Sequence, residues 1–134
     1  MFLYHSYLFF TEECRTLNGC EEGEAKITFG YKLPAKNVIH TVGPMGEVPS
    51  LLQSCYINSV ACAIENDIKV IAFPCISTGI YGYPNVAAAK VALESVRLVL
   101  ESNYKDIERI IFVVFLNEDE HIYKKYIQYY FPPE

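Results

Sequence analysis

Short apolar runs alternate along this chain with segments whose apolar residues recur at helical spacing. Two nearly continuous apolar runs, residues 68–76 (IKVIAFPCI) and 107–116 (IERIIFVVFL), are typical of strands buried on both faces of a sheet. The segment between them predicts an amphipathic helix whose inner face is Val86, Ala89, Leu93, Val96 and Leu100. Strand, helix and strand joined in this way predict parallel neighbours in an α/β sandwich.

The remaining pattern predicts two further strands and three further helices. Residues 25–31 and 37–42 are expected to be strands on either side of a turn at Leu33-Pro34. A helix before them should end at Asn18-Gly19, a pair that suits a left-handed cap.

Two helices are expected to begin at polar caps. Ser50 is the expected cap of the first, whose inner face would be Leu52, Cys55, Ser59, Cys62 and Ala63. Asn117 is the expected cap of the last, with Glu120 as its capping-box partner. The inner face of this last helix would be Ile122, Tyr126 and Tyr130.

The opening decapeptide MFLYHSYLFF departs from this regular pattern. It is too short to span a bilayer, and it lacks the charged start and cleavage site of a signal peptide. We expect it to pack onto the core as a strand or helix.

The composition limits the classes of partner that this chain is expected to bind. The 134 residues are 51% hydrophobic and carry a net charge of −5 with no basic run, as expected for a single domain spanning residues 1–134. Polynucleotide and membrane-surface binding both require clusters of Lys or Arg, so neither partner is expected. A small anion remains open, because main-chain amides bind one without net positive charge.

The five cysteines, an odd number without a CxxC pair, predict neither a zinc site nor a disulfide framework. Reduced thiols in an intracellular protein, nuclear or cytoplasmic, are the expectation, and no cofactor or metal is expected. Cys75 just before the loop described next leaves a catalytic thiol as the sharper alternative to a small buried residue.

The most informative segment follows the first apolar run: Ser77-Thr78-Gly79-Ile80-Tyr81-Gly82. Ligands of open α/β sheets lie beyond the carboxyl ends of the strands, where this segment enters a helix. Gly79 and Gly82 allow left-handed angles and close approach, so successive N–H groups could surround a phosphate. Ser77 and Thr78 would add hydroxyl donors, and Ile80 and Tyr81 would exclude water. The alternative is an ordinary tight connection, since the pattern is neither GxGxxG nor a Walker A motif.

Two long ungapped blocks, residues 14–44 (CRTLNGCEEGEAKITFGYKLPAKNVIHTVGP) and 70–89 (VIAFPCISTGIYGYPNVAAA), resemble macro domains of the MacroD type. The resemblance runs from about residue 11 to the C-terminus, with residues 1–10 divergent. It implies a three-layer α/β/α sandwich with a mixed, largely parallel sheet. It also implies binding of ADP-ribose or mono-ADP-ribosylated protein, with hydrolysis of glutamyl or aspartyl esters and of O-acetyl-ADP-ribose.

The resemblance assigns the 77–82 loop to the diphosphate and distal ribose. It places Phe115 against the adenine, with plain core packing as the alternative, and Asn117 beside it at the strand end. His40 within VIHTVGP is either a hydrogen-bonded core histidine or a general base. Residues 41–43 are expected to pass the pocket rim without supplying chemistry.

The chain departs from the MacroD pattern at its start. It contains no Asn-Ala-Ala-Asn segment, no Gly-Gly-Gly run and no adenine-side Asp. Tyr81 is then only a weak catalytic candidate, and we expect ADP-ribose binding with impaired turnover. A working hydrolase and a truncated or splice-derived chain that acts by association, through exposed apolar surface, are the alternatives.

Overall fold

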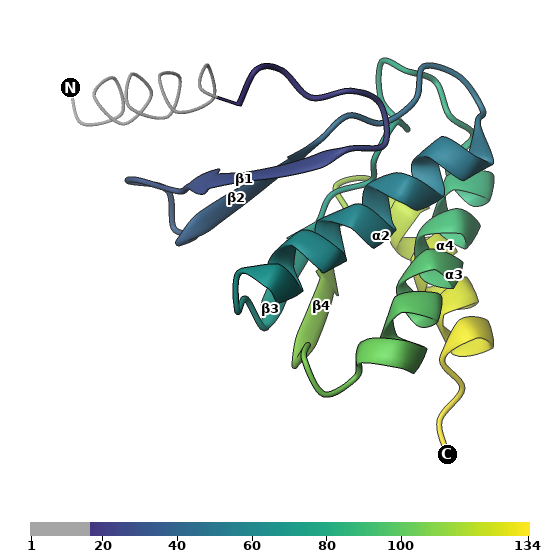
Figure 1. Cartoon of the computed structure of the whole chain (residues 1–134). Helices are drawn as coiled ribbons and strands as arrows, with labels where there is room; N and C mark the ends of the chain where they lie inside the picture. Colours follow the sequence, from purple (N-terminus) through teal and green to yellow (C-terminus); the bar gives the residue numbers. More distant parts are fainter. Residues whose placement is uncertain (1–16) are drawn as a thin grey trace.

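The structure is a computed structural model that describes residues 17–134. It is an α/β domain with four strands and three helices in the described residues (Figure 1). In chain order the elements are β1 Ala25–Phe29, β2 Asn37–Thr41, α2 Pro49–Glu65, β3 Val70–Phe73, α3 Asn85–Asn103, β4 Arg109–Phe112 and α4 Asn117–Tyr130. The expectations for the opening decapeptide and for the body of the first helix lie outside the described residues.

The strands form two separate pairs. β1 and β2 are antiparallel, with Ile27 opposite Ile39, and β3 and β4 are parallel, with Ile71 opposite Ile110. The parallel pair confirms the predicted crossover through α3. The expected single mixed sheet is not continuous within the described part, because β2 and β3 share no hydrogen-bonded ladder there.

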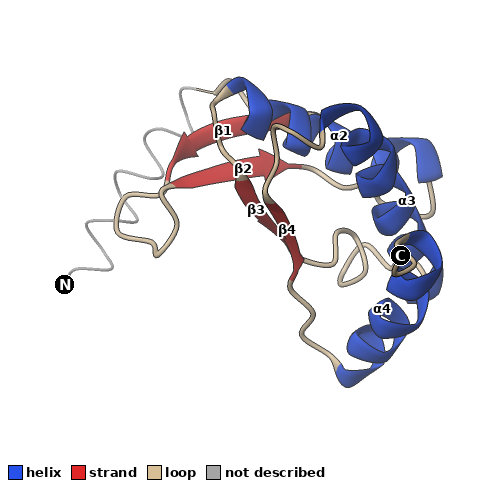
Figure 2. Cartoon of the chain, turned by 90° about the horizontal axis from the view of Figure 1, so that it is seen from below, coloured by secondary structure: helices blue, strands red, loops and turns tan. Residues whose placement is uncertain are grey.

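The three helices gather on one side of the strands (Figure 2). Their buried side chains, together with alternate residues of β3, form one core around Leu52, Tyr56, Val60, Leu93 and Val96. The expected inner face of α2 is buried throughout. In α3, Ala89, Leu93 and Val96 are buried as predicted, whereas Val86 is exposed and Ala92 takes the core position instead.

The strands differ from the prediction in length and burial. The apolar runs 68–76 and 107–116 contain only four strand residues each, because Pro74 and the segment after Phe112 leave the ladder. β3 buries only Ile71 and Phe73 and exposes Val70 and Ala72 within the described part, so the expectation of burial on both faces was wrong.

Both predicted helix caps were also wrong. The N-cap of α2 is Val48, because Pro49 occupies the first helical turn, where its missing N–H costs nothing. The N-cap of α4 is Leu116, and Asn117 is already helical. Glu120 pairs with Lys124 one turn later rather than with the cap. The predicted left-handed pair before β1 is confirmed, since Asn18 has φ 56° and Gly19 φ 80°.

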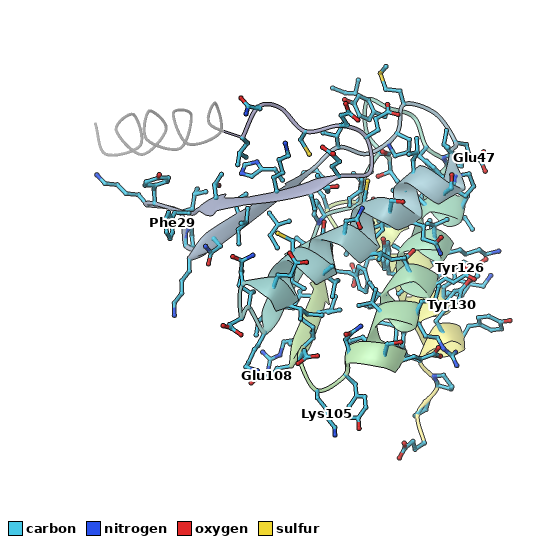
Figure 3. The ribbon with its side chains drawn as sticks, in the orientation of Figure 1. Phe29, Glu47, Lys105, Glu108, Tyr126 and Tyr130 are labelled. Carbon is cyan, nitrogen blue, oxygen red and sulfur yellow. The ribbon has the colours of Figure 1, made fainter. Side chains whose placement is uncertain are left out.

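Aromatic side chains lie on two opposite sides of the domain. Tyr126 and Tyr130 lie on the α3–α4 side, away from Phe29 on the β1–β2 pair (Figure 3). Lys90 Nζ lies 5.0 Å from the centre of the Tyr126 ring, which links α3 to α4.

Candidate functional site

The loop between β3 and α3 is closed on itself by short hydrogen bonds. The Tyr83 N–H donates to the Ser77 carbonyl at 2.9 Å, and the Gly82 N–H donates to the Gly79 carbonyl at 3.0 Å. The Thr78 hydroxyl donates to the Cys75 carbonyl at 3.1 Å. These bonds hold a compact turn at the carboxyl end of β3, the end at which ligands of α/β sheets bind.

Two residues of this loop adopt left-handed angles, and only one of them, Gly82, is a glycine that the sequence singles out. Ser77 has φ 64° and Gly82 has φ 68°. Gly79 does not have a positive φ, and a Cβ there would meet nothing within 4 Å. The backbone angle at position 82 therefore favours glycine. At position 79 the backbone does not require glycine, and a side chain there would project into open space.

Ser77 carries the most informative polar atom of the site. Its Oγ is buried and has no hydrogen-bond partner among the described residues. Buried hydroxyls are normally paired, so the Ser77 hydroxyl is a candidate for a bond to a water or a ligand. The Ser59 and Tyr83 hydroxyls share this unpaired state. The Thr78 hydroxyl, by contrast, is already used within the loop.

Gly43 is a site residue that sequence reasoning missed. A Cβ at Gly43 would lie 2.1 Å from Ser77 Oγ and 2.6 Å from Ile76 Cγ2, so only glycine fits against the loop. A second contact comes from the same β2–α2 connection, because the Gly46 N–H donates to the Tyr81 carbonyl at 3.3 Å. The Val-Gly-Pro sequence after β2 was the available signal, and it was interpreted as a passive rim.

A groove of about 1190 Å³ lies beside this loop. β2 and β3 line its length, and Gly43, Ser77 and Tyr81 lie at the end where β3 leaves the sheet. Asp67 is the only carboxylate among the described residues that line the groove, and it precedes β3, at the opposite end from Ser77. No carboxylate therefore lines the end near the loop among the described residues, although Asp119 and Glu47 lie close enough to act on Cys75 and Tyr83 from outside the groove.

The α3 N-terminus lies directly after the loop. α3 begins at Asn85 without a side-chain cap and without acidic residues in its first turn, so its free N–H groups favour an anion. Asn85 Nδ2 donates to Asp119 Oδ1 at 2.9 Å, and Asp119 is buried at the start of α4. This bond joins the N-terminal ends of α3 and α4 beneath the site.

The other predicted site residues are dispersed. Ile80 is fully exposed and Tyr81 is 41% exposed on the loop surface. Phe115 is 93% exposed, which excludes core packing, the alternative left open for this residue. Phe115 lies on the β4–α4 connection and the exposed Asn117 begins α4, and neither lines the groove.

His40 and Cys75, the two residues considered as a general base and a nucleophile, have surroundings that fit structural roles. His40 Nε2 and Thr28 Oγ1 are 2.8 Å apart across the β1–β2 pair, as expected for a packed, hydrogen-bonded histidine. Burial, together with the nearby Asp119 carboxylate, raises the pKa of the Cys75 thiol, which opposes a nucleophilic thiolate.

Within residues 17–134, no three His, Cys, Asp or Glu side chains are grouped so as to hold a metal ion. None of the described helices combines the length and the apolar character needed to cross a membrane.

The fold and the loop define an α/β domain with a closed turn at the carboxyl end of a parallel strand. The Macro domain family model matches residues 9–92. The chain therefore belongs to the macro domain family.

Similar proteins support the same family. ADP-ribose glycohydrolase MACROD2 of Xenopus laevis is 56% identical over 128 residues, which make up 91% of this chain and 31% of that protein. ADP-ribose glycohydrolase MACROD1 of Bos taurus is 53% identical over 129 residues, covering 91% of this chain and 39% of that protein. The Trypanosoma brucei macrodomain solved in complex with ADP-ribose aligns with a TM-score of 0.84 at 42% identity, covering 86% of this chain and 50% of that one. The chain thus spans a third to a half of the length of these relatives.

Proposed function

We propose that this chain binds ADP-ribose, with the diphosphate held by the loop of residues 77–82. The buried, unpartnered Ser77 hydroxyl at the groove end carries the proposal. The loop amides support it, because the N–H groups of residues 78–81 donate to no main-chain carbonyl of the described residues. The uncapped α3 N-terminus directly after the loop adds further free N–H groups. The Trypanosoma brucei relative was solved with ADP-ribose.

We further propose that this chain binds ADP-ribose but does not hydrolyse ADP-ribosyl substrates efficiently. The sequence contains no Asn-Ala-Ala-Asn segment and no Gly-Gly-Gly run. The groove end beside Ser77 has no carboxylate among its described lining residues, so no acid is placed there to orient a water. Tyr81 remains a weak catalytic candidate because its side chain lines that end. The glycohydrolase activity for which the MACROD relatives are named therefore does not transfer directly to this chain.

Isothermal titration with ADP-ribose tests binding, and Gly79 offers a matched pair of variants. Gly79→Ala adds a methyl group to open space and should leave affinity within about twofold of the parent chain. Gly79→Glu adds a negative charge to the same space and should weaken binding by at least about tenfold. An absence of heat at millimolar ADP-ribose from the folded chain would remove the proposal.

Release of ADP-ribose from a glutamyl-modified protein tests the second part. We expect binding in the titration and little or no release over the uncatalysed rate. Rapid release that is lost in Gly79→Glu would instead establish a working hydrolase.

One observation favours association as a second candidate function. Large apolar side chains are strongly exposed within the described residues, including Ile80, Phe115 and Met45. Contiguous apolar surface is used for protein contacts, and the association candidate requires that these side chains form such a patch. Size exclusion and circular dichroism discriminate, since a monomer peak with a cooperative melt would oppose this candidate.

A further inference from the structure

The β2–α2 connection, residues 42–48, contacts both ends of the loop of residues 77–82. At the first end Gly43 lies against Ser77, and at the second the Gly46 N–H donates to the Tyr81 carbonyl at 3.3 Å. Figure 1 shows the two segments side by side at the top of the view. Gly43, Ser77 and Tyr81 line the same end of the groove, so this connection forms part of the candidate site.

The contact at Gly43 leaves no room for a side chain. A Cβ at this position would lie 2.1 Å from Ser77 Oγ and 2.6 Å from Ile76 Cγ2, closer than side-chain atoms pack. Ile76 is 9% exposed and belongs to the core, so it cannot move aside without disturbing its neighbours. Gly43 does not have a positive φ, so the close approach alone requires glycine there.

We propose that Gly43 is a positioning residue that sets the direction of the Ser77 hydroxyl, and that the β2–α2 connection holds the loop in its ligand-binding shape. This inference rests on the proposed function, in which the loop holds the diphosphate. Binding groups act within about 0.5 Å of their productive positions. Ser77 is already fixed at φ 64° by the bond from the Tyr83 N–H to its carbonyl, so a side chain at position 43 would displace the hydroxyl or the whole loop.

A double-mutant cycle tests the link between Gly43 and Ser77. Ile76→Leu removes the branched Cγ2 and serves as the background, so that only the Ser77 contact remains. In this background Gly43→Ala should weaken ADP-ribose binding about tenfold, and Ser77→Gly, which suits the left-handed angle, about fivefold. The combined variant should bind no more than about twofold more weakly than Ser77→Gly alone, because no hydroxyl remains to be displaced. A loss of about fiftyfold, the product of two independent effects, would overturn the proposal.

A matched pair of glycines tests the Tyr81 end of the loop. Gly46 has φ 90° and Gly19 has φ 80°, and a Cβ at either position would meet nothing within 4 Å. Alanine therefore strains the backbone similarly at both positions. Gly46→Ala should weaken ADP-ribose binding at least about threefold, because it shifts the connection that bonds Tyr81, whereas Gly19→Ala should stay within about twofold of the parent chain. Equal affinities of the two variants would show that the connection does not hold the loop.

The outcomes separate this inference from the proposed function. A parent chain that does not bind ADP-ribose contradicts the proposed function itself. A parent chain that binds, with independent losses in the cycle, contradicts only the positioning role of Gly43. A purely structural role predicts that Gly43→Ala lowers the affinity equally with and without the Ser77 hydroxyl, so the cycle also distinguishes positioning from a general loss of stability. Urea unfolding of the same variants measures that loss of stability directly.

Discussion

At the scale of the residue, Ser77 combines a left-handed backbone with a buried hydroxyl that no described group bonds. Both features cost stability in the free chain, because a non-glycine φ near +60° and an unpaired buried hydroxyl are each unfavourable. Strain kept at the end of a groove is typical of a binding position. Thr78, the neighbouring residue, uses its hydroxyl to hold the loop and serves as a natural comparison.

Replacing these hydroxyls should therefore separate binding from stability. Ser77→Ala should leave the free energy of unfolding unchanged or raise it by up to about 1 kcal/mol, because an unpaired buried polar group is removed. The same change should weaken ADP-ribose binding by about five- to tenfold through the loss of one donor. Urea unfolding and titration calorimetry measure the two effects.

Thr78→Val provides the contrast. It should lower the free energy of unfolding by about 1 kcal/mol, through loss of the bond to the Cys75 carbonyl, and affect affinity less than Ser77→Ala does. Reversed patterns in the two variants would show that the ligand contacts Thr78 rather than Ser77.

Sequence reasoning located this loop but did not identify how each residue contributes. The position after an apolar strand and before a helix was readable from periodicity alone. The left-handed angle fell on Ser77 rather than Gly79, since the choice depends on which carbonyl the turn bonds. Gly43 was missed because its need for a hydrogen side chain arises from Ser77, a residue distant in sequence.

At the scale of the element, the site rests on two helix N-termini that meet beneath it. Asn85 opens α3 and Asp119 lies in the first turn of α4, and the bond between them joins the helices. Asp119 is 6% exposed, so its carboxylate depends on the Asn85 amide and on the α4 N-terminus for polar contacts.

Removing this bond should destabilise the domain. Asn85→Ala is expected to lower the free energy of unfolding by about 1.5 to 3 kcal/mol, because a buried carboxylate loses its amide donor. A double-mutant cycle with Asp119→Ala should give a coupling energy of about 1 to 2 kcal/mol by urea unfolding. Asn117→Ala, at the exposed start of α4, should change stability by less than about 0.5 kcal/mol. A coupling energy near zero would mean that the two side chains do not interact in solution.

Two buried tyrosines join the helices to the parallel strands. Tyr56 of α2 lies 5.0 Å from Phe73 between ring centres, and Tyr123 of α4 lies 5.2 Å from Phe112. Burial raises the pKa of both phenols well above the usual value, because the ionised form loses hydration.

The raised pKa values predict a loss of stability in alkali. Above about pH 10 the unfolded tyrosines release protons that the folded ones retain, so stability should fall by up to about 1.4 kcal/mol per pH unit for each phenol. This contribution is fully present below pH 10 and is lost as the pH rises. Urea unfolding of Tyr56→Phe should show a shallower decline between about pH 10 and about pH 11. Ile122→Val, a core change without a proton, should keep the slope of the parent chain, and an unchanged slope in Tyr56→Phe would contradict the prediction.

Element boundaries show where periodicity stops being informative. Ser50 and Asn117 are good capping residues, yet Pro49 and the path of the chain after β4 start both helices one residue or more earlier. Hydrophobic patterning correctly predicted the buried face of α2 and the Ala89, Leu93 and Val96 positions of α3, but not Val86. It could not show that β2 and β3 share no ladder within residues 17–134, because a ladder depends on which strand occupies the neighbouring position.

At the scale of the whole molecule, the net charge of the chain bears on how it could hold a negatively charged ligand. The chain carries a net charge of −5, and ADP-ribose is itself negative. Its diphosphate would be held mainly by main-chain N–H groups and the α3 N-terminus, whose contacts do not require counterion release. Lys36 and Lys69 line the groove, but they belong to the segments that lead into β2 and β3, at the end away from Ser77.

The affinity for ADP-ribose should therefore respond weakly to salt, and in the opposite direction to that of a nucleic-acid binder. Raising sodium chloride from about 50 mM to about 500 mM screens the repulsion between two negative bodies, so affinity should stay constant or rise by up to about threefold. A polynucleotide held through several lysines would lose orders of magnitude over the same range. Titration calorimetry at several salt concentrations measures the slope, and Lys36→Gln/Lys69→Gln should leave it unchanged. A steep fall in affinity with salt, abolished in that variant, would show that the groove lysines rather than the loop amides hold the phosphates.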